Sequence, residues 1–304
     1  MRIFAALQIL NKKLIHTFAD YLETKPRFLI PEDAPVFPEG KNAWVETLYQ
    51  LMVNLYDGYI FSPYIQKRMY NPTLVMYLLK QLEELDGQLP ESLIDFNLIP
   101  DRGRLEYIAG LPGGKDLIME LNQNNRIEIS KITPRFGLTD MIEKSVKTRE
   151  FMGSYLYFMG MLTIEKKLLS GNMGLTIPNP VTQNLYIDGL ARWIIADPLE
   201  RDMGFDAANQ FKQQGKIAPL RKYIENRVFP TFHWRDKRWV NELTIKTIFM
   251  CLMMDETNFL MISERQSRSG YADLAMIVRP DRRHFHLKNV LIEFKFIKNK
   301  KFEN

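Results

Sequence analysis

Two short apolar runs near the end of the chain place the strongest constraint on its fold. Residues 274–278 (LAMIV) and 290–292 (VLI) are apolar, partly β-branched, and bounded by polar residues. Such runs predict short buried strands. The segment between them contains Pro280 and several charged residues, which predicts a turn. We therefore expect these two runs to form a β-hairpin.

Charged residues stand at the ends of both runs, although an unpaired charge is costly in a buried strand. Asp273 opens the first run, and Glu293 and Lys295 follow the second. Residues two apart on a strand point to one face, and Asp273 can reach the same face. Two carboxylates repel each other unless a hard cation such as Mg²⁺ binds them. This pattern suits a divalent metal and a phosphodiester; the alternative is an edge strand with a surface Glu–Lys pair, which contributes little stability.

The residues around these positions resemble a known family. The segment 263–274, followed by Ile-Glu-Phe-Lys at 292–295, is similar to the nuclease-like domain of the PD-(D/E)XK superfamily. In many bacterial proteins this domain follows an AAA-ATPase-like domain. The resemblance implies that Asp273 is the single acid of the family motif. Glu293 and Lys295 then stand at the acid-x-lysine positions.

The resemblance also implies a role for each site residue. Asp273 and Glu293 are expected to bind Mg²⁺ or Mn²⁺, with the backbone carbonyl of Phe294 completing the coordination. Lys295 is expected to orient or deprotonate a water. Glu242, in a predicted helix upstream, matches the helix acid of the family and is expected to add an outer-shell or second-metal contact.

Three departures from the family pattern leave the activity open. Tyr271 stands where the family usually has arginine, and no histidine follows Glu242. The chain stops at Asn304, nine residues after Lys295, whereas related domains continue into a further helix and strand. The expectation is a truncated or degenerate copy, whose last strand exposes an edge that favours self-association or poor solubility.

The resemblance extends upstream of the nuclease-like part. The segments 54–61, containing Tyr-Asp-Gly-Tyr, and 70–75, beginning Tyr-Asn-Pro, are similar to a signature late in AAA-ATPase-like domains. The segments 155–164 and 177–179, ending in Pro-Asn, resemble the connector that precedes the nuclease part. The resemblance therefore covers most of the chain from about Tyr56 onward.

The expected fold class is α/β in the α+β sense, with several modules, because 304 residues exceed the roughly 100–200 of a usual domain. Residues 1–147 are expected to be the helical C-terminal part of an AAA-ATPase-like domain. Residues 148–220 are predicted to form a helix, a hairpin and a second helix, which is the pattern of a winged-helix-like connector. Because the second helix is not basic, we favour a packing or connecting role over DNA binding. Residues 221–304 are expected to form an incomplete restriction-endonuclease-like αβββ core.

An ATP site is not expected in this chain. The segment 110–116 (GLPGGKD) superficially resembles a phosphate-binding loop. That loop requires four residues between the first glycine and Gly-Lys, and a serine or threonine after the lysine. Here three residues intervene, and Asp116 follows Lys115. An acid at that position would repel phosphate, so we interpret the segment as a connecting loop.

Composition agrees with a globular protein that acts in the cytoplasm. The chain is 46% hydrophobic and 25% charged, and no apolar run reaches the roughly 18–20 residues of a membrane span. Cys251, the single cysteine, lies in an apolar run and is expected to be a buried small hydrophobe. His284 and His286 would share one side of a strand, but without an evident third ligand we favour a solvated hairpin face over zinc.

The positive charge of the chain is concentrated around the predicted site. Residues 264–304 contain ten Lys and Arg against five Asp and Glu, a surplus equal to the net charge of +5 of the whole chain. A basic rim attracts polyanions, although a solvated lysine-rich tail explains the same excess. Two functions remain open: a metal-dependent nuclease acting on nucleic acid, with DNA favoured over RNA, and a non-catalytic remnant that binds a partner protein.

Overall fold

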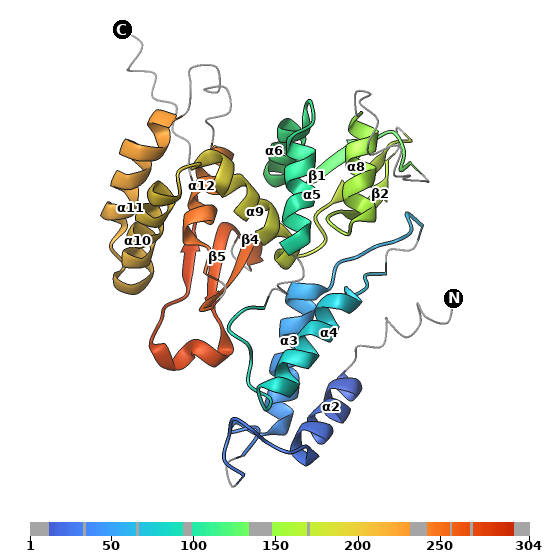
Figure 1. Cartoon of the computed structure of the whole chain (residues 1–304), viewed down its shortest axis with the longest axis vertical. Helices are drawn as coiled ribbons and strands as arrows, with labels where there is room; N and C mark the ends of the chain where they lie inside the picture. The colour runs from blue at the N-terminus through green and yellow to red at the C-terminus, as the bar shows by residue number, and fades with distance from the viewer. Residues whose placement is uncertain are drawn as a thin grey trace. The chain divides into compact units, whose positions relative to one another are not determined.

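The computed structural model of the chain combines helices with two small antiparallel sheets (Figure 1). It describes residues 12–32, 35–64, 67–93, 99–133, 148–168, 171–231, 242–255, 257–267 and 270–294. The predicted α+β class is confirmed. The chain divides into two compact units, Met1–Leu185 and Tyr186–Asn304. This division does not coincide with the three ranges expected from the sequence.

The first unit begins with a helical group. It contains α2 (Lys12–Thr24), α3 (Lys41–Tyr56) and α4 (Pro72–Glu84). Their buried side chains recur at helical spacing: Ile15, Ala19, Leu22, Val45, Leu48, Leu51, Met52, Leu74, Leu78 and Leu82. Helix α4 begins at Pro72, because the Asn71 side chain accepts hydrogen bonds from the N–H groups of Thr73 and Leu74 and Pro72 occupies the first turn.

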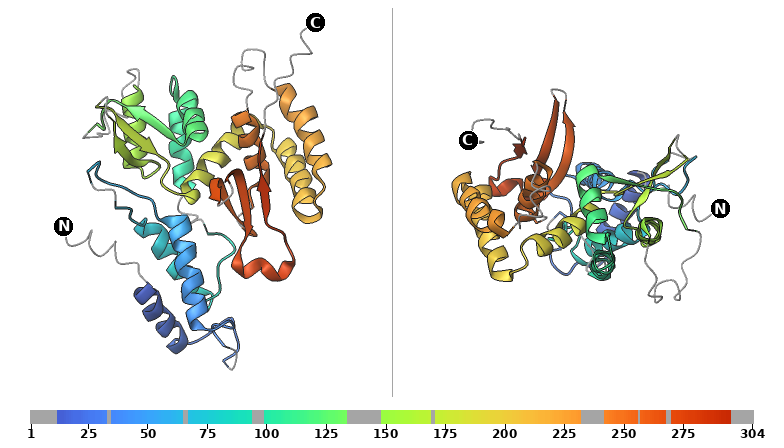
Figure 2. Two further views of the ribbon diagram at one scale, coloured as in Figure 1. Left: turned by 180° about the vertical axis from the view of Figure 1, so that it is seen from behind. Right: turned by 90° about the horizontal axis from the view of Figure 1, so that it is seen from above.

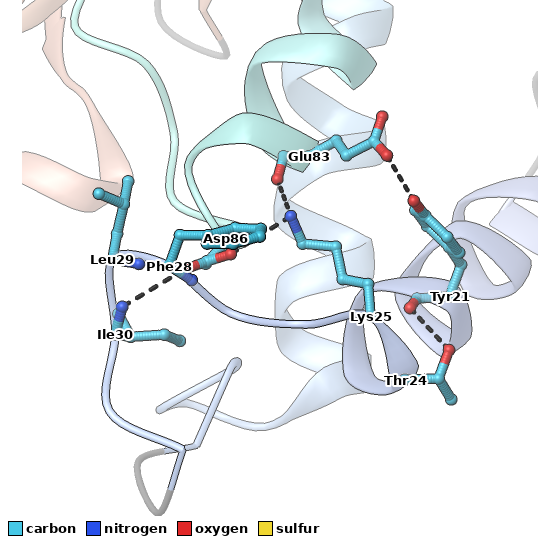
Figure 3. A network of polar contacts seen from close by, with 8 residues as sticks. All are labelled: Tyr21, Thr24, Lys25, Phe28, Leu29, Ile30, Glu83 and Asp86. Carbon is cyan, nitrogen blue, oxygen red and sulfur yellow. Dashed lines mark hydrogen bonds and ion pairs between the residues drawn. The ribbon is translucent and has the colours of Figure 1, made fainter.

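A buried carboxylate ties the loop after α2 to the turn after α4 (Figure 3). Asp86, which is 1% exposed, accepts hydrogen bonds from the N–H groups of residues 28–30 at 2.8, 2.6 and 3.3 Å. Lys25 lies 3.3 Å from the second oxygen and also donates to the carbonyl of Glu83. The N–H of Leu29 above all, together with these neighbours, lowers the pKa of Asp86 to about 2.

The rest of the first unit contains a three-stranded antiparallel sheet with three helices. The elements are α5 (Ile99–Ala109), α6 (Gly114–Asn124), β1 (Arg126–Ile129), α8 (Arg149–Phe158), β2 (Thr163–Lys167) and β3 (Met173–Thr176). The strand order is β1-β3-β2. The predicted hairpin of β2 and β3 is present. The pairing of β1 with β3, through Ile127 and Leu175, is visible only in the structure.

The glycine pair in the segment 110–116 allows close packing of the turn between α5 and α6. Gly113 has a φ of 76°, and a Cβ atom on Gly114 would lie 1.7 Å from the carbonyl oxygen of Ile108. Only glycine fits such an approach without a backbone shift. The close contact between the end of α5 and the start of α6 therefore accounts for the presence of glycine at these two positions.

The upstream sequence motifs meet at one contact inside the first unit. Gly58, with a φ of 133°, lies so close to Pro178 that a Cβ atom would be 1.8 Å from the Pro178 carbonyl oxygen. The hydroxyl of Tyr59 donates to the carbonyl of Gly160 at 2.9 Å and accepts from the Asn71 amide at 3.3 Å. The motifs at 54–61, 70–75, 155–164 and 177–179 thus join the helical group to the sheet.

The second unit contains a helical layer and the second sheet. Helix α9 (Pro180–Ile194) runs across the division between units. The helical elements that follow are α10 (Pro198–Gln214), α11 (Ile217–Tyr223), the π-helix η2 (Ile224–Val228), η3 (Phe229–Thr231) and α12 (Glu242–Met253). The sheet region contains β4 (Phe259–Ser267), β5 (Gly270–Val278), η5 (Pro280–Phe285) and β6 (Val290–Ile292). The strand order is β4-β5-β6, and both panels of Figure 2 show β4 and β5 as a long ribbon. Helices α10 and α11 pack side by side.

The core of this unit includes residues of α12 and of β5. Leu274, Ala275 and Met276 of β5 are completely buried, and Cys251 on α12 is 2% exposed. The Cys251 thiol donates to the carbonyl of Ile187 at 3.2 Å, and burial raises its pKa. The prediction that Cys251 is a buried hydrophobe is confirmed.

The structure confirms one strand pairing expected from the sequence and corrects two details. Strands β5 and β6 pair antiparallel, with Leu274 opposite Ile292. However, β5 begins at Gly270, so Asp273 lies within this strand rather than at its start, and β5 also pairs with β4. The connection from β5 to β6 contains the 3₁₀-helix η5, and His286 ends it with a φ of 57°. The placement of both histidines on a strand is therefore wrong, because the proline at the start of η5 turns the chain away from extended geometry. Among the described residues, no helix is long and apolar enough to cross a bilayer.

Candidate functional site

The sheet brings two of the predicted acids to neighbouring positions. Leu274 of β5 lies opposite Ile292 of β6, and Asp273 and Glu293 are each one residue beyond this pair. In an antiparallel ladder, residues that lie opposite each other project to the same face with Cβ atoms about 4.5–5.5 Å apart. Continuation of this register by one residue beyond the last ladder pair would place the two carboxylates on one face of the sheet.

A hydrogen bond fixes the more buried of the two acids. The carboxylate of Asp273 accepts the N–H of Phe294 at 2.7 Å. Asp273 is half-buried and Glu293 is exposed. The bond continues the contact between β5 and the chain beyond the last ladder pair, so that the end of β6 stays next to Asp273. A held carboxylate loses less conformational freedom on binding a ligand than a mobile one.

The ring of Phe294 connects the acid pair to α12. It packs edge to face against Phe249, with ring centroids 5.5 Å apart and an angle of 73°. Glu242 is the first residue of α12, seven residues before Phe249, which corresponds to about 10 Å along the helix axis. The structure thus brings together Asp273, Glu293 and Phe294. It places the backbone of Glu242 at the start of the helix, and Lys295 lies outside the described residues.

The donor atoms of this site are of the kind that Mg²⁺ and Mn²⁺ prefer. The carboxylates of Asp273 and Glu293 and the main-chain carbonyl of Phe294 are oxygen ligands for a hard cation. In the part of the chain that the structure describes, no group of three or more His, Cys, Asp or Glu is placed to hold a metal. A divalent ion at this position would therefore combine two carboxylates with carbonyl and water ligands. The residues fit such an ion by donor type.

Two buried cations in this unit were missed by sequence reasoning. Lys246 on α12 is 7% exposed, and Arg279 after β5 is completely buried. Each has an interaction partner, and the N–H of Arg279 donates to the carbonyl of Asn258. Their burial could have been inferred from the sequence, because Lys246 lies within the apolar sequence of α12 and Arg279 directly follows the apolar strand β5. Buried cations require compensation, so both residues constrain how the helix and sheet pack.

Phe294, whose N–H donates to Asp273, borders an apolar hollow of about 250 Å³. Its lining comes from the helical turns that follow α10, from α12 and from the residue after Glu293. The lining residues are Ile217, Arg221, Ile224, Glu225, Phe229, Ile245, Phe249 and Phe294. Phe294 therefore has two roles, since its N–H binds Asp273 while its side chain borders the hollow.

Comparison with known proteins identifies this part of the chain. A family model described as the PD-(D/E)XK nuclease superfamily matches residues 240–304, which include α12, all three strands, and the positions of Asp273, Glu293 and Lys295. No curated protein and no solved structure matches the chain significantly. The AAA-ATPase-like resemblance of the upstream segments stays a prediction. The nuclease-type resemblance is confirmed at the level of the superfamily for residues 240–304.

Proposed function

We propose that the second unit is a metal-dependent nuclease that hydrolyses phosphodiester bonds of nucleic acid, with DNA favoured over RNA. The observation that supports this proposal is the hydrogen bond from the N–H of Phe294 to the carboxylate of Asp273, directly after the last pair of the β5–β6 ladder, Leu274 with Ile292. The superfamily match to residues 240–304 agrees with this reading.

Each site residue would have a separate role in metal binding or catalysis. Asp273 and Glu293 hold a Mg²⁺ or Mn²⁺ ion, and the carbonyl of Phe294 adds a third protein ligand. When bound, such an ion supplies positive charge at the phosphate and lowers the pKa of a coordinated water. Lys295 orients the attacking water and offsets charge on the phosphate. Glu242 contributes an outer contact or a second metal ligand.

The test combines metal binding with cleavage. The full chain is titrated with Mn²⁺ by calorimetry, and cleavage of labelled duplex DNA, single-stranded DNA and RNA is followed with Mg²⁺, Mn²⁺ or Ca²⁺. Ca²⁺ is expected to bind but to support cleavage poorly. Asp273→Asn should lose metal binding and cleavage together, because it removes one of two carboxylate ligands. Lys295→Ala should lose cleavage and retain metal affinity.

A matched control comes from an exposed acid elsewhere in the unit. Asp206 on α10 is exposed, so Asp206→Asn should retain both metal binding and cleavage. Failure of the folded wild-type chain to bind a divalent ion would contradict the proposal. It would favour the alternative from the sequence, in which the chain is a non-catalytic remnant that binds a partner protein.

We also propose that residues 1–147 are related to the helical part of AAA-ATPase-like domains and that residues 148–220 form the connector that follows it. The support is the meeting of the upstream motifs at the contact of Gly58 with Pro178. Because these segments pack as one body, their resemblance concerns a single structural unit.

A further inference from the structure

The hollow that Phe294 borders has the size and chemistry of a pocket for a planar ring. Its volume of about 250 Å³ exceeds the roughly 150 Å³ of an engineered apolar cavity that accepts benzene. Three phenylalanines, Phe229, Phe249 and Phe294, contribute to its lining. Aromatic rings bind other planar rings by stacked or edge contacts. A nucleobase is a planar ring system of suitable size.

The hollow is reachable from solvent. Ile217, which borders it, is 46% exposed, and the two charged lining residues, Arg221 and Glu225, are also exposed. These two side chains form a loose ion pair at 3.8 Å, which contributes little in water. Entry of a ligand into the hollow would therefore require no buried ion pair to break.

The helical segment that contributes part of the lining carries an excess of positive charge. Residues 216–227 contain four Lys and Arg against one Glu. All four cations are exposed. Arg221 pairs with Glu225 and Arg227 with Glu200, whereas Lys216 and Lys222 add positive charge beside the lining residues Ile217 and Arg221. Exposed cations attract the phosphates of a nucleic acid without regard to base sequence. The combination of an apolar pocket with a basic rim is typical of sites for single-stranded nucleic acid.

The backbone at the rim is irregular in a way that often accompanies function. Ile224 and Glu225 belong to η2, a five-residue π-helical segment between α11 and η3. π-Helical turns are rare and frequently occur at functional sites. Here the wider turn forms part of the wall of the hollow.

We propose that this hollow binds one unpaired base of the nucleic acid whose backbone is cleaved at Asp273 and Glu293. The assignment of nucleic acid as substrate rests on the proposed function. Phe294 links the two places, because its N–H is bonded to Asp273 while its side chain borders the hollow. The substrate is then single-stranded, or has a base turned out of the duplex. The nearly apolar lining gives stacking with little discrimination among bases.

Binding can be tested separately from cleavage. The anisotropy of a labelled oligothymidylate of about 12 nucleotides is measured in EDTA, beside an abasic oligomer of equal length and an oligouridylate. Wild-type protein should bind the oligothymidylate more tightly than the abasic oligomer. Phe229→Ala and Phe249→Leu should each weaken binding of the oligothymidylate by about 5- to 150-fold, the usual cost of losing one stacked base. Neither variant should change binding of the abasic oligomer, and the oligouridylate distinguishes DNA from RNA.

Controls address folding and surface effects. Leu199→Ala, at an apolar residue that is 73% exposed on α10, should leave binding unchanged. Phe249 is buried, so the thermal unfolding of Phe249→Leu is first compared with that of the wild type. If Phe249→Leu does not fold, the inference is tested with Phe229→Ala and Ile217→Ala instead.

Three outcomes would overturn the inference. The first is equal affinity of the wild-type chain for the oligothymidylate and the abasic oligomer. The second is that the wild-type chain does not bind the oligothymidylate in EDTA. If the same preparation still cleaves duplex DNA when a divalent ion is added, that result contradicts the base pocket and leaves the proposed nuclease function standing. The third is a Phe229→Ala variant that dissociates a self-associated form without altering oligonucleotide affinity, which would identify a second copy of the chain as the occupant.

Discussion

Replacement of Gly58 by alanine should destabilise the first unit strongly. A Cβ atom at this position would lie 1.8 Å from the carbonyl oxygen of Pro178 and 2.8 Å from its carbonyl carbon. Ordinary contact begins at about 3.4 Å, so the two backbone segments must separate by about 1.6 Å. Such a shift also disturbs the bonds that Tyr59 makes to Gly160 and Asn71.

The expected magnitude has two parts. Overpacking of a close contact costs typically about 1–3 kcal/mol. The φ of 133° adds about 1–3 kcal/mol for a residue with a Cβ atom. Together these give a loss of about 2–6 kcal/mol in the free energy of unfolding of the first unit. Gly171→Ala is the matched control, because Gly171 has a φ of 86° with no atom within 4 Å of the added Cβ.

Hydrogen exchange and urea unfolding provide the measurement. Gly58→Ala should accelerate amide exchange in residues 57–64 and 160–178, while exchange in α10 and α12 stays as in the wild type. Its urea midpoint should fall further than that of Gly171→Ala, since only Gly58→Ala combines strain with a clash. The reasoning is refuted if Gly58→Ala unfolds at the same urea concentration as Gly171→Ala, or if faster exchange is not confined to the two segments in contact.

Two further predictions concern stability and association. The pKa of Asp86 is lowered to about 2, below its ordinary value near 4, so its stabilising effect should be complete above pH 4 and vanish as the pH falls towards 2. The difference in urea midpoint between wild type and Asp86→Asn should accordingly shrink over that interval; a difference independent of pH would show that the carboxylate charge is not the cause. Strand β6 lies at one edge of its sheet with Leu291 66% exposed, so we expect concentration-dependent self-association that Leu291→Lys reduces in sedimentation experiments. A wild-type chain that stays monomeric at high concentration would contradict this.

Much of the second unit and its candidate site was predictable from local patterns. The runs at 274–278 and 290–292 identified β5 and β6, because short apolar segments between polar residues have few other stable arrangements. The same patterns predicted that Asp273 and Glu293 share one face of the sheet, and this part of the site stays a prediction. The apolar surroundings of Cys251 correctly predicted its burial.

Other features depended on contacts between residues far apart in the chain. The pairing of β1 with β3, the separate strand β4 and the meeting of Gly58 with Pro178 involve partners that no local period identifies. The hollow also arises this way, because Phe229, Phe249 and Phe294 come from three different segments.

The sequence by itself determined which residues are apolar, that the runs at 274–278 and 290–292 lie in strands, and which acids are close to them in the chain. Only the tertiary structure decided that the N–H of Phe294 holds Asp273 and that the same residue borders an apolar hollow. The physical reason is that side-chain periodicity reports the environment of each segment, whereas a site requires several segments to be packed against one another. That packing is decided by the joint burial of distant residues and by backbone groups, which all residue types except proline share equally.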